Sequence, residues 1–462
     1  MELLGSLGVL VGIFMIIFLA VKEMNIILAA PLATLFVIVF NQMDPISTLL
    51  GTEKLQFMGA LGNYVMSYFA VFLLGSVLAE LMKSSGATVA IADYILAKMG
   101  HDNPYRVMVA IFMIAAILTY GGISLFVAMF AIIPLARDLF KKLDISWSLI
   151  QTPVWLGIAT ITMTMLPGTP AIQNVIPIQY LGTSLTAAAI PSILGAIACT
   201  VWGLWYMKFA LNRSIAKGET YATHTKDEEI ILEDRELPSF GASILPLAVL
   251  VTIAIVGSVF GNEFWKTNVI YFALIVGILL AIVLFRSFIP NTMQALSVGA
   301  QGSIGPLFST SSAVAFGAVV MAAPGFALFS EMLLGIPGGP EVQLTVLTAA
   351  MSGITGSTSG ALGIVLPTYG QYFVDAGMHP EMVHRLASVA ANILTDVPHG
   401  GAVITFLTLT KLNYKNGFKD LFTVVTIGAI ISAVVIILSG AMFRSEERRV
   451  GKECRSRWSP YH

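Results

Sequence analysis

The chain has 462 residues, of which 56% are hydrophobic and only 11% are charged. Soluble globular proteins carry about 25% charged residues, so this composition excludes a soluble domain and predicts an all-α polytopic protein of the lipid bilayer. The net charge of −1 at pH 7 indicates no class of partner, and no basic stripe runs along the sequence, so nucleic acid is not expected as a partner. The two cysteines, Cys199 and Cys454, are too few for a disulfide framework or a metal site.

Apolar runs of the length needed to cross a bilayer, about 20 residues, recur along the chain. They predict crossings at residues 3–21, 25–41, 58–82 and 185–211, and again at 242–260, 268–287, 304–334 and 421–442. A segment after the third run, residues 84–100, is amphipathic and too short and polar to cross, so it is expected at the membrane interface.

Two apolar stretches with glycine-rich centres are predicted to form re-entrant hairpins. Residues Tyr105 to Leu139 are too few for two crossings and a turn, and basic residues flank both ends, so a hairpin tip is expected at 121–124. A second hairpin is expected at about Val342–Val374, with its tip in the sequence G-S-T-S-G. The main alternative topology counts both hairpins as full crossings.

Two further spans are interrupted by proline and are predicted to be broken helices. The first, Ser146–Tyr180, contains T-M-L-P-G-T-P-A-I-Q-N, and prolines so close together cannot lie in one continuous helix. The second, at about Val383–Thr410, contains T-D-V-P-H-G-G. Each break frees helix ends inside the membrane, which the protein must enclose.

The same order of elements occurs twice, which divides the chain into two inverted repeats. Residues 1–212 form the first repeat, 213–239 a cytoplasmic linker and 240–444 the second repeat. Each repeat is expected to have five crossings, a re-entrant hairpin and a broken helix, and an odd number of crossings inverts the second copy, as in many secondary transporters. Residues 445–462 differ abruptly in composition and are interpreted as a non-native tail.

The distribution of positive charge supports a topology with the N-terminus outside. Most Lys and Arg residues then lie on the cytoplasmic side, and the outer loops hold only Lys54, Lys266 and Arg385. In this interpretation no Lys or Arg lies inside a predicted span.

The polar segment 353–401 and its counterpart 121–174 are predicted to line one watered cavity, because lipid does not accept unpaired backbone or charge. The free N-terminal ends of the half-helices suit a carboxylate, which hydroxyl and other polar groups would help to hold. The residues expected to bind substrate are Ser124, Thr169, Asn174, Ser357, Thr358, Ser359, Thr395 and His399. The alternative explanation is that small residues only allow close helix packing.

An acid and a histidine occur in the second copy of the break and not in the first. Asp396 and His399 lie three residues apart, close enough to share a proton and couple its passage to transport. The alternative is that Asp396 caps the half-helix after the break. The tips and breaks also offer carbonyl and hydroxyl ligands for Na⁺, so sodium coupling is the main rival to proton coupling.

An enzyme is not expected, and neither a catalytic residue, a metal site nor a cofactor is assigned. G-S-T-S-G has threonine where a nucleophile elbow has serine, and the spacing singles out no Ser/His pair. An intramembrane hydrolase and a channel remain alternatives, although repeats with broken helices favour alternating access.

Three stretches resemble known transporters. Leu394–Thr405 (L-T-D-V-P-H-G-G-A-V-I-T) resembles the P-H-N-G-A-V region of the gluconate permease family of proton symporters, and Phe72–Ala87 is similar to that family's first repeat. L-P-G-T-P-A-I-Q-N resembles the G-T-P-P-N break of the broader ion transporter superfamily. The resemblance implies a homodimer in a bacterial cytoplasmic membrane, with a scaffold domain and a moving transport domain in each protomer.

The chain departs from the family pattern at three places. Gly400 replaces the asparagine of P-H-N-G, and Gly121 lies where the family has an acidic residue near the first hairpin tip. The first break is T-M-L-P-G-T-P, where the family has a His/Pro-rich sequence. The resemblance therefore implies an elevator-type proton symporter of a small organic anion, either gluconate or a shorter hydroxy acid such as 3-hydroxybutyrate. A sodium-coupled di- or tricarboxylate transporter is the alternative.

Overall fold

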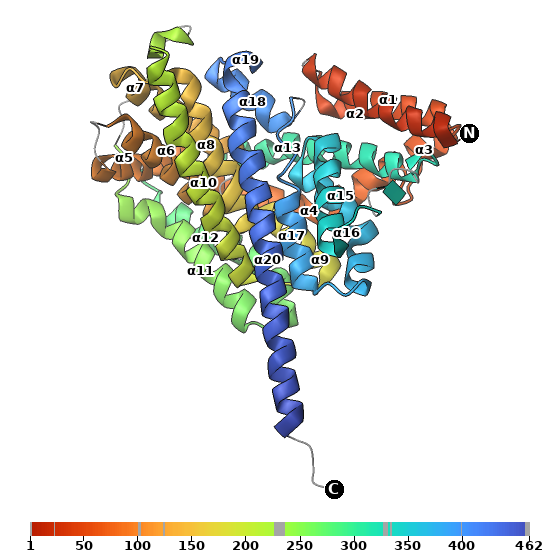
Figure 1. Ribbon diagram of the computed structural model, residues 1–462. Helices are drawn as coiled ribbons and strands as arrows, with labels where there is room; N and C mark the ends of the chain where they lie inside the picture. Colours follow the sequence, from red (N-terminus) through yellow and green to blue (C-terminus); the bar gives the residue numbers. More distant parts are fainter. Residues whose placement is uncertain are drawn as a thin grey trace.

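The computed structural model describes residues 2–22, 24–99, 103–122, 125–225, 236–326, 331–332, 335–398 and 400–457. In these ranges the chain forms helices joined by turns and loops, and none of the described residues lies in a strand. The predicted all-α fold is therefore confirmed (Figure 1).

Over its described residues, the first half contains ten α-helices, a 3₁₀ turn and a π-helical segment. They are α1 (Glu2–Val21), α2 (Ile26–Phe40), α3 (Pro45–Leu50), α4 (Phe57–Ser84), α5 (Ala87–Met99), α6 (Pro104–Tyr120), α7 (Leu125–Lys142), η1 (Trp147–Ile150), α8 (Gln151–Leu156), η2 (Gly157–Met165), α9 (Ile172–Leu181) and α10 (Ala189–Ala216). The second half contains η3 (Tyr221–Thr223), α11 (Phe240–Phe260), α12 (Glu263–Leu284), α13 (Thr292–Ala322), α15 (Gly339–Thr355), α16 (Thr358–Asp375), α17 (Pro380–Ala390), α18 (Gly401–Thr410), α19 (Tyr414–Gly417) and α20 (Lys419–Arg457).

The two predicted hairpins are present as helix pairs that break at glycine. α6 packs against α7 and the break contains Gly122 with φ +90°; α15 packs against α16 and the break contains Gly356 with φ +59°. Glycine adopts positive φ without the strain that a Cβ would cause. Both breaks fall at the glycine-rich tips that the sequence predicts.

The two predicted broken helices are present as well. In the first half α8 continues as η2, stops before the break and resumes as α9; in the second half α17 stops and α18 resumes the path. Pro167 and Pro398 lie in these breaks, and each has its carbonyl oxygen bonded by a tyrosine. Tyr120 Oη donates to Pro167 O at 3.0 Å, and Tyr414 Oη donates to Pro398 O at 2.7 Å. Tyrosine hydroxyls thus satisfy acceptors that the breaks release.

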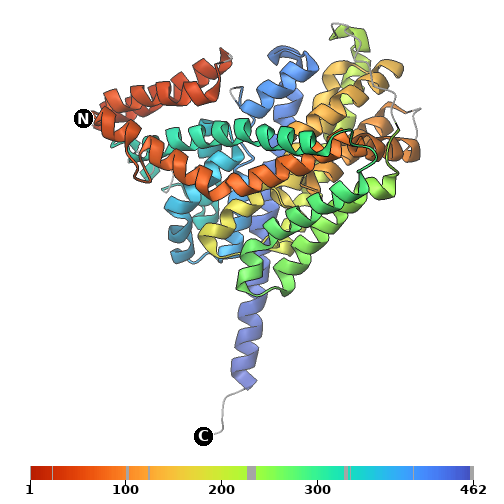
Figure 2. The same cartoon turned by 180° about the vertical axis from the view of Figure 1, so that it is seen from behind.

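The halves exchange elements instead of packing as separate bodies. α2 packs on α13 of the second half, and α12 packs on α4 of the first half. In the same way α9 packs on α16, and α18 packs on α7, so each broken helix meets the hairpin of the other half. α4 and α13 lie side by side across the molecule, in front of these half-helices in the view of Figure 2.

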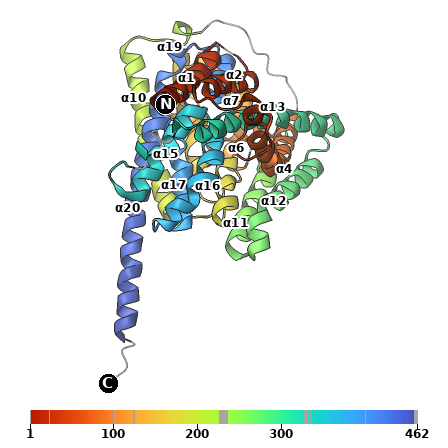
Figure 3. The same ribbon diagram turned by 90° about the vertical axis from the view of Figure 1, so that its right-hand side faces the viewer.

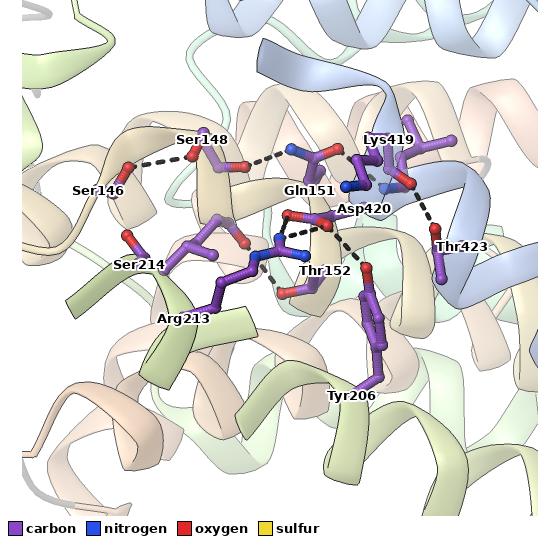
Figure 4. A network of polar contacts seen from close by, with 12 residues as sticks. Ser146, Ser148, Gln151, Thr152, Tyr206, Arg213, Ser214, Lys419, Asp420 and Thr423 are labelled. Atoms are coloured by element: carbon purple, nitrogen blue, oxygen red, sulfur yellow. Dashed lines mark hydrogen bonds and ion pairs between the residues drawn. The ribbon is translucent and has the colours of Figure 1, made fainter. Parts of the chain in front are cut away.

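α10 and α20 form one edge of the molecule, and α11, α12 and α4 form the opposite edge (Figure 3). A polar cluster ties the start of α20 to α10 (Figure 4). Arg213 Nη2 lies 2.7 Å from both carboxylate oxygens of Asp420, and Tyr206 Oη donates to Asp420 Oδ1 at 2.7 Å. Gln151 joins the same cluster, because its Oε1 accepts from Leu421 N at 2.9 Å.

Four helices in the described ranges are long and apolar enough to cross a bilayer: Phe57–Ser84, Ala189–Ala216, Thr292–Ala322 and Tyr414–Gly440. Their outward faces carry exposed apolar side chains such as Ile197, Val201 and Leu438, which suits contact with lipid. The last helix continues through most of the tail at 445–462 and projects beyond the rest of the molecule (Figure 1).

Candidate functional site

A cavity of about 830 Å³ lies where both hairpin tips and both helix breaks meet. The tips contribute Gly122 and Ser357, and the breaks contribute Ala171 and Asp396. α4 and α13 close the opposite wall with small and polar residues such as Ser76 and Ser309. The sequence pairs the segments 121–174 and 353–401, and the structure brings both of them to one cavity.

Four helices begin at the wall of this cavity. The first residues of α7, α9, α16 and α18 all line it: Leu125, Ile172, Thr358 and Gly401. The first N–H groups of a helix have no partner within that helix, and the helix dipole makes this end partly positive. Four such ends around one cavity create a positive environment that suits a carboxylate, and no buried cation occurs among the described residues that line it.

The second hairpin tip supplies a row of hydroxyl groups. Ser357 is the N-cap of α16 and its Oγ accepts from Gly360 N at 3.1 Å, while Ser359 Oγ lies 3.3 Å from it. Thr355 Oγ1 donates to Ser357 O at 3.0 Å, which holds the turn together. The predicted residues Ser357, Thr358 and Ser359 therefore all line the cavity.

Asp396 lies in the second break and reaches the cavity together with Thr395. Only 3% of Asp396 is exposed, and its Oδ2 has no hydrogen-bond partner among the described residues. The nearby Asn392 also lines the cavity and donates to Ala159 O at 2.7 Å, which joins the second break to η2. Asp396 is thus a buried carboxyl group in the cavity wall, and its second oxygen has no hydrogen-bond partner among the described residues.

Gln173, in the first turn of α9, is a cavity residue that the sequence interpretation missed. Its Nε2 donates to Thr358 Oγ1 at 2.8 Å, across the two halves. Its Oε1 is buried without a hydrogen-bond partner in the described residues. Gln173 belongs to the break sequence A-I-Q-N and directly precedes Asn174, which the sequence predicts as a substrate residue. Only the packing of α9 on α16 shows that Gln173, and not Asn174, lines the cavity.

The other predicted substrate residues occupy different places. Thr169 is fully buried, does not line the cavity, and accepts from Ala171 N at 3.3 Å. Asn174 is also fully buried and lies behind the wall, where its amide bonds to protein groups only. Ser124 and His399 lie outside the described residues, so their roles in substrate binding and proton coupling stay predictions.

Arg385 corrects the charge interpretation, which placed it in an outer loop and left the spans without a cation. The structure places Arg385 inside α17, completely buried. The positive-inside rule counts arginines as loop residues, so it assigned Arg385 to a loop. The structure instead accommodates the buried guanidinium because acceptors at the first helix break bind it. Its Nη1 donates to Thr164 O and its Nη2 to Asn174 Oδ1, both at 3.0 Å. It does not line the cavity.

The cavity also has one ion pair at its rim on α4. Lys83 Nζ lies 3.3 Å from Glu80 Oε2, and both residues line the cavity. The lysine side chain is 54% exposed, so this pair lies in a wetter region than Asp396. In the described ranges no group of three or more His, Cys, Asp or Glu side chains has an arrangement that could hold a metal ion.

Comparisons with known proteins match the chain to transporters. A family model described as "GntP family permease" matches residues 4–442. The chain is 30% identical over 470 residues to "Uncharacterized transporter YxjC" of Bacillus subtilis (strain 168), covering 93% of this chain and 98% of the relative. It is 29% identical over 259 residues to an "Uncharacterized transporter" of Haemophilus influenzae, covering 55% of this chain and 56% of the relative.

One solved structure is similar in fold. The YdaH transporter of Alcanivorax borkumensis, whose topology is described as unusual, matches with a TM-score of 0.57 over 84% of this chain and 88% of that chain. The sequences are 17% identical, so this likeness concerns the fold alone.

Proposed function

Because the chain belongs to the GntP permease family, we propose that this membrane transporter is a proton-coupled symporter of a small hydroxy acid such as gluconate or 3-hydroxybutyrate. The family match over residues 4–442 confirms the permease family that the resemblance of Leu394–Thr405 indicates. A transporter is generally not an enzyme, and the hydrolase alternative has no support from these relatives.

The observation that carries the proposal is the convergence of four helix N-termini on one cavity. A carboxylate held by these ends binds without a fixed counter-cation, so its release does not leave a buried charge behind. The cavity volume of about 830 Å³ leaves room for a small organic acid together with water. The anion would lie nearest the N-cap residue Ser357.

Two unpaired acceptors on residues that line the cavity favour an acid that carries hydroxyl groups. Gln173 Oε1 and Asp396 Oδ2 are both buried and without a donor in the described residues. A buried acceptor without a partner costs about 1–3 kcal/mol, and a substrate hydroxyl removes that cost for Gln173. An unsubstituted acid of the same length would leave the glutamine unsatisfied and should bind more weakly.

Asp396 supports proton coupling. The cost of holding an ionised carboxylate in a buried position is relieved when the group takes up a proton. Such a group, next to a bound anion, links the arrival of the proton to the arrival of the substrate, since two negative charges repel each other. His399 would share this proton.

The packing supports an elevator-type movement. The hairpins and broken helices contact one another across the two halves and enclose most of the cavity, while α4 and α13 form its opposite wall. We expect the first group to move past the second as one body, in a homodimer in the bacterial cytoplasmic membrane, with the second repeat inverted relative to the first.

Uptake by reconstituted protein tests the proposal. Proteoliposomes are given labelled gluconate, 3-hydroxybutyrate, butyrate or citrate under an imposed proton or sodium gradient. We expect a proton gradient to drive accumulation of a hydroxy acid, and butyrate to compete poorly. Accumulation that follows only the sodium gradient would support the sodium-coupled alternative, and passive flux without coupling would indicate a channel.

The variant Asp396→Asn addresses coupling directly. It should retain counterflow of labelled substrate but lose accumulation driven by the proton gradient. Asp375→Asn is the matched control, because Asp375 is exposed at the end of α16 and does not line the cavity. Full proton-driven accumulation by Asp396→Asn would refute the coupling role.

A further inference from the structure

A buried histidine and a buried arginine lie next to each other on α17, outside the cavity. His384 and Arg385 are both 0% exposed, and neither lines the cavity. In the described ranges no carboxylate lies within ion-pair distance of Arg385. A buried cation is costly unless its donors find acceptors, so the partners of this guanidinium indicate what it holds in place.

The partners of Arg385 all belong to the first half of the chain. Nη1 donates to Thr164 O at 3.0 Å and Nη2 to Asn174 Oδ1 at 3.0 Å. Nε and Nη2 also donate to Ala187 O, at 3.4 and 3.3 Å. Thr164 lies in the last turn of η2, where the terminal carbonyls form the negative end of the helix dipole. The charge is therefore offset by a helix end and by neutral acceptors.

Asn174 is the shared acceptor of the cluster. Its Oδ1 accepts from Arg385 and also from His384 Nε2 at 3.0 Å. Its Nδ2 donates to Thr169 O and to Leu185 O, both at 2.9 Å. These bonds occupy both ends of the amide, so Asn174 is fixed to α17 on one side and to the loops around the first break on the other.

The residue before Asn174 is the cavity residue Gln173. Its backbone carbonyl accepts from Ser388 Oγ at 3.1 Å, a third contact from α17. Its side chain points the other way and donates to Thr358 at the tip of the second hairpin. The first turn of α9 is thus held from behind by α17, while the Gln173 side chain lies in the cavity wall.

We propose that Arg385 is a positioning residue for the substrate site: it fixes the first turn of α9 through Asn174 and so sets where Gln173 meets the substrate. Arg385 itself does not touch the substrate. The expected effect of Arg385 on the KM of transport rests on the proposed transport function. The expected effect of Arg385 on the position of Gln173 does not.

Transport kinetics give the first test. Arg385→Lys keeps a positive charge but lacks the planar fork that reaches acceptors on three segments. A displacement of about 1 Å of a group that contacts the substrate strongly weakens that contact. If Gln173 shifts in this way, we expect KM for labelled 3-hydroxybutyrate and gluconate to rise about tenfold. Ser388→Ala, a milder change that should fold, is expected to raise KM several-fold in the same direction. Arg137→Lys is the control, because Arg137 is also buried but lies over the Trp147 ring, away from the cavity.

A double-mutant cycle separates positioning from a general structural role. If Arg385 acts through Gln173, then Arg385→Lys adds no further rise in KM once Gln173→Ala is present. If the two substitutions raise KM independently, the KM of the double variant equals the product of the two single effects, and Arg385 does not act through Gln173. If Arg385→Lys leaves KM unchanged and only lowers the amount of folded protein, Arg385 only stabilises the fold. Either result would overturn the inference.

A cross-linking experiment tests the geometry without transport. The variants Gln173→Cys and Thr358→Cys are combined in a background in which both cysteines of the chain are replaced (Cys199→Ala and Cys454→Ala), and a short bifunctional thiol reagent is added. We expect rapid cross-linking when Arg385 is present and at least a several-fold slower reaction with Arg385→Lys. An unchanged rate would refute the inference. A slowed rate in a protein that transports none of the acids would retain the positioning role and reject the proposed function instead.

Discussion

Replacement of Asp420 by asparagine tests whether the cluster between α10 and α20 stabilises the fold. Asp420 accepts from Arg213 Nη2 at 2.7 Å on both oxygens and from Tyr206 Oη at 2.7 Å. Asparagine keeps one oxygen for Tyr206 but loses the negative charge and the second acceptor. Arg213 then remains partly buried without its counter-ion.

The size of the effect follows from the burial of the pair. The side chains of Arg213 and Asp420 are 28% and 8% exposed, so the pair is neither a surface pair nor a fully enclosed one. Exposed pairs contribute about 0–1 kcal/mol. Loss of one partner of a buried pair costs about 3–5 kcal/mol. Hydrogen bonds to charged groups contribute about 1.5–3 kcal/mol. We therefore expect a loss of about 2 kcal/mol in the free energy of unfolding.

Thermal unfolding of the purified protein in detergent, followed by intrinsic fluorescence, measures this loss. A change of about 2 kcal/mol should lower the midpoint by about 2 °C in a chain of 462 residues, because the entropy of unfolding grows with chain length. Lys217→Gln is the control: this lysine side chain is 61% exposed and its nitrogen lies 3.8 Å from Glu219. A midpoint for Asp420→Asn that equals that of the control would refute the reasoning.

Three further predictions concern the first hairpin tip, the second hairpin tip and the tail. Gly122→Ala should reduce the initial rate of uptake at least tenfold, because φ is +90° and the new Cβ would lie 2.9 Å from Pro170 Cγ. Gly182→Ala, with φ +62° but open space around it, should leave uptake close to normal, and equal losses would show that backbone strain alone is responsible. Ser357→Ala removes the N-cap of α16, so the midpoint should fall by the equivalent of about 1 kcal/mol, and Ser357→Asn should restore it. Removal of residues 445–462 should leave midpoint and uptake unchanged, because this part of α20 projects away from the other helices (Figure 1), and a lower midpoint would contradict this.

The hairpins and breaks were predictable because their causes are local. Glycines that adopt positive φ, such as Gly122 and Gly356, mark the tips, and prolines mark the breaks wherever they occur in an apolar run. The family resemblance drew on the same local motifs. These signals also placed Ser357 and Asp396 at the cavity, because both belong to the interrupted segments themselves.

The missed and corrected residues depend on contacts between distant segments. Gln173 faces the cavity only because α9 packs on α16, and no local pattern distinguishes it from Asn174. Arg385 is tolerated inside α17 only because Thr164 and Ala187, from the first half, offer free carbonyls. A count of positive charge along the sequence does not include such partners, so it assigned this arginine to a loop.

The exchange of elements between the halves has a consequence for biosynthesis. α2 enters the bilayer long before its partner α13 has been translated, and α4 likewise enters before its partner α12. Such non-local pairings slow folding in water and expose the chain to aggregation. In the bilayer, helices whose partners have not yet been made contact lipid tails that are as apolar as those partners. Their unpaired state therefore costs little free energy. If the chain is divided in the linker and its two halves are expressed as separate polypeptides, the halves should therefore still assemble in the membrane. Neither half should be stable alone.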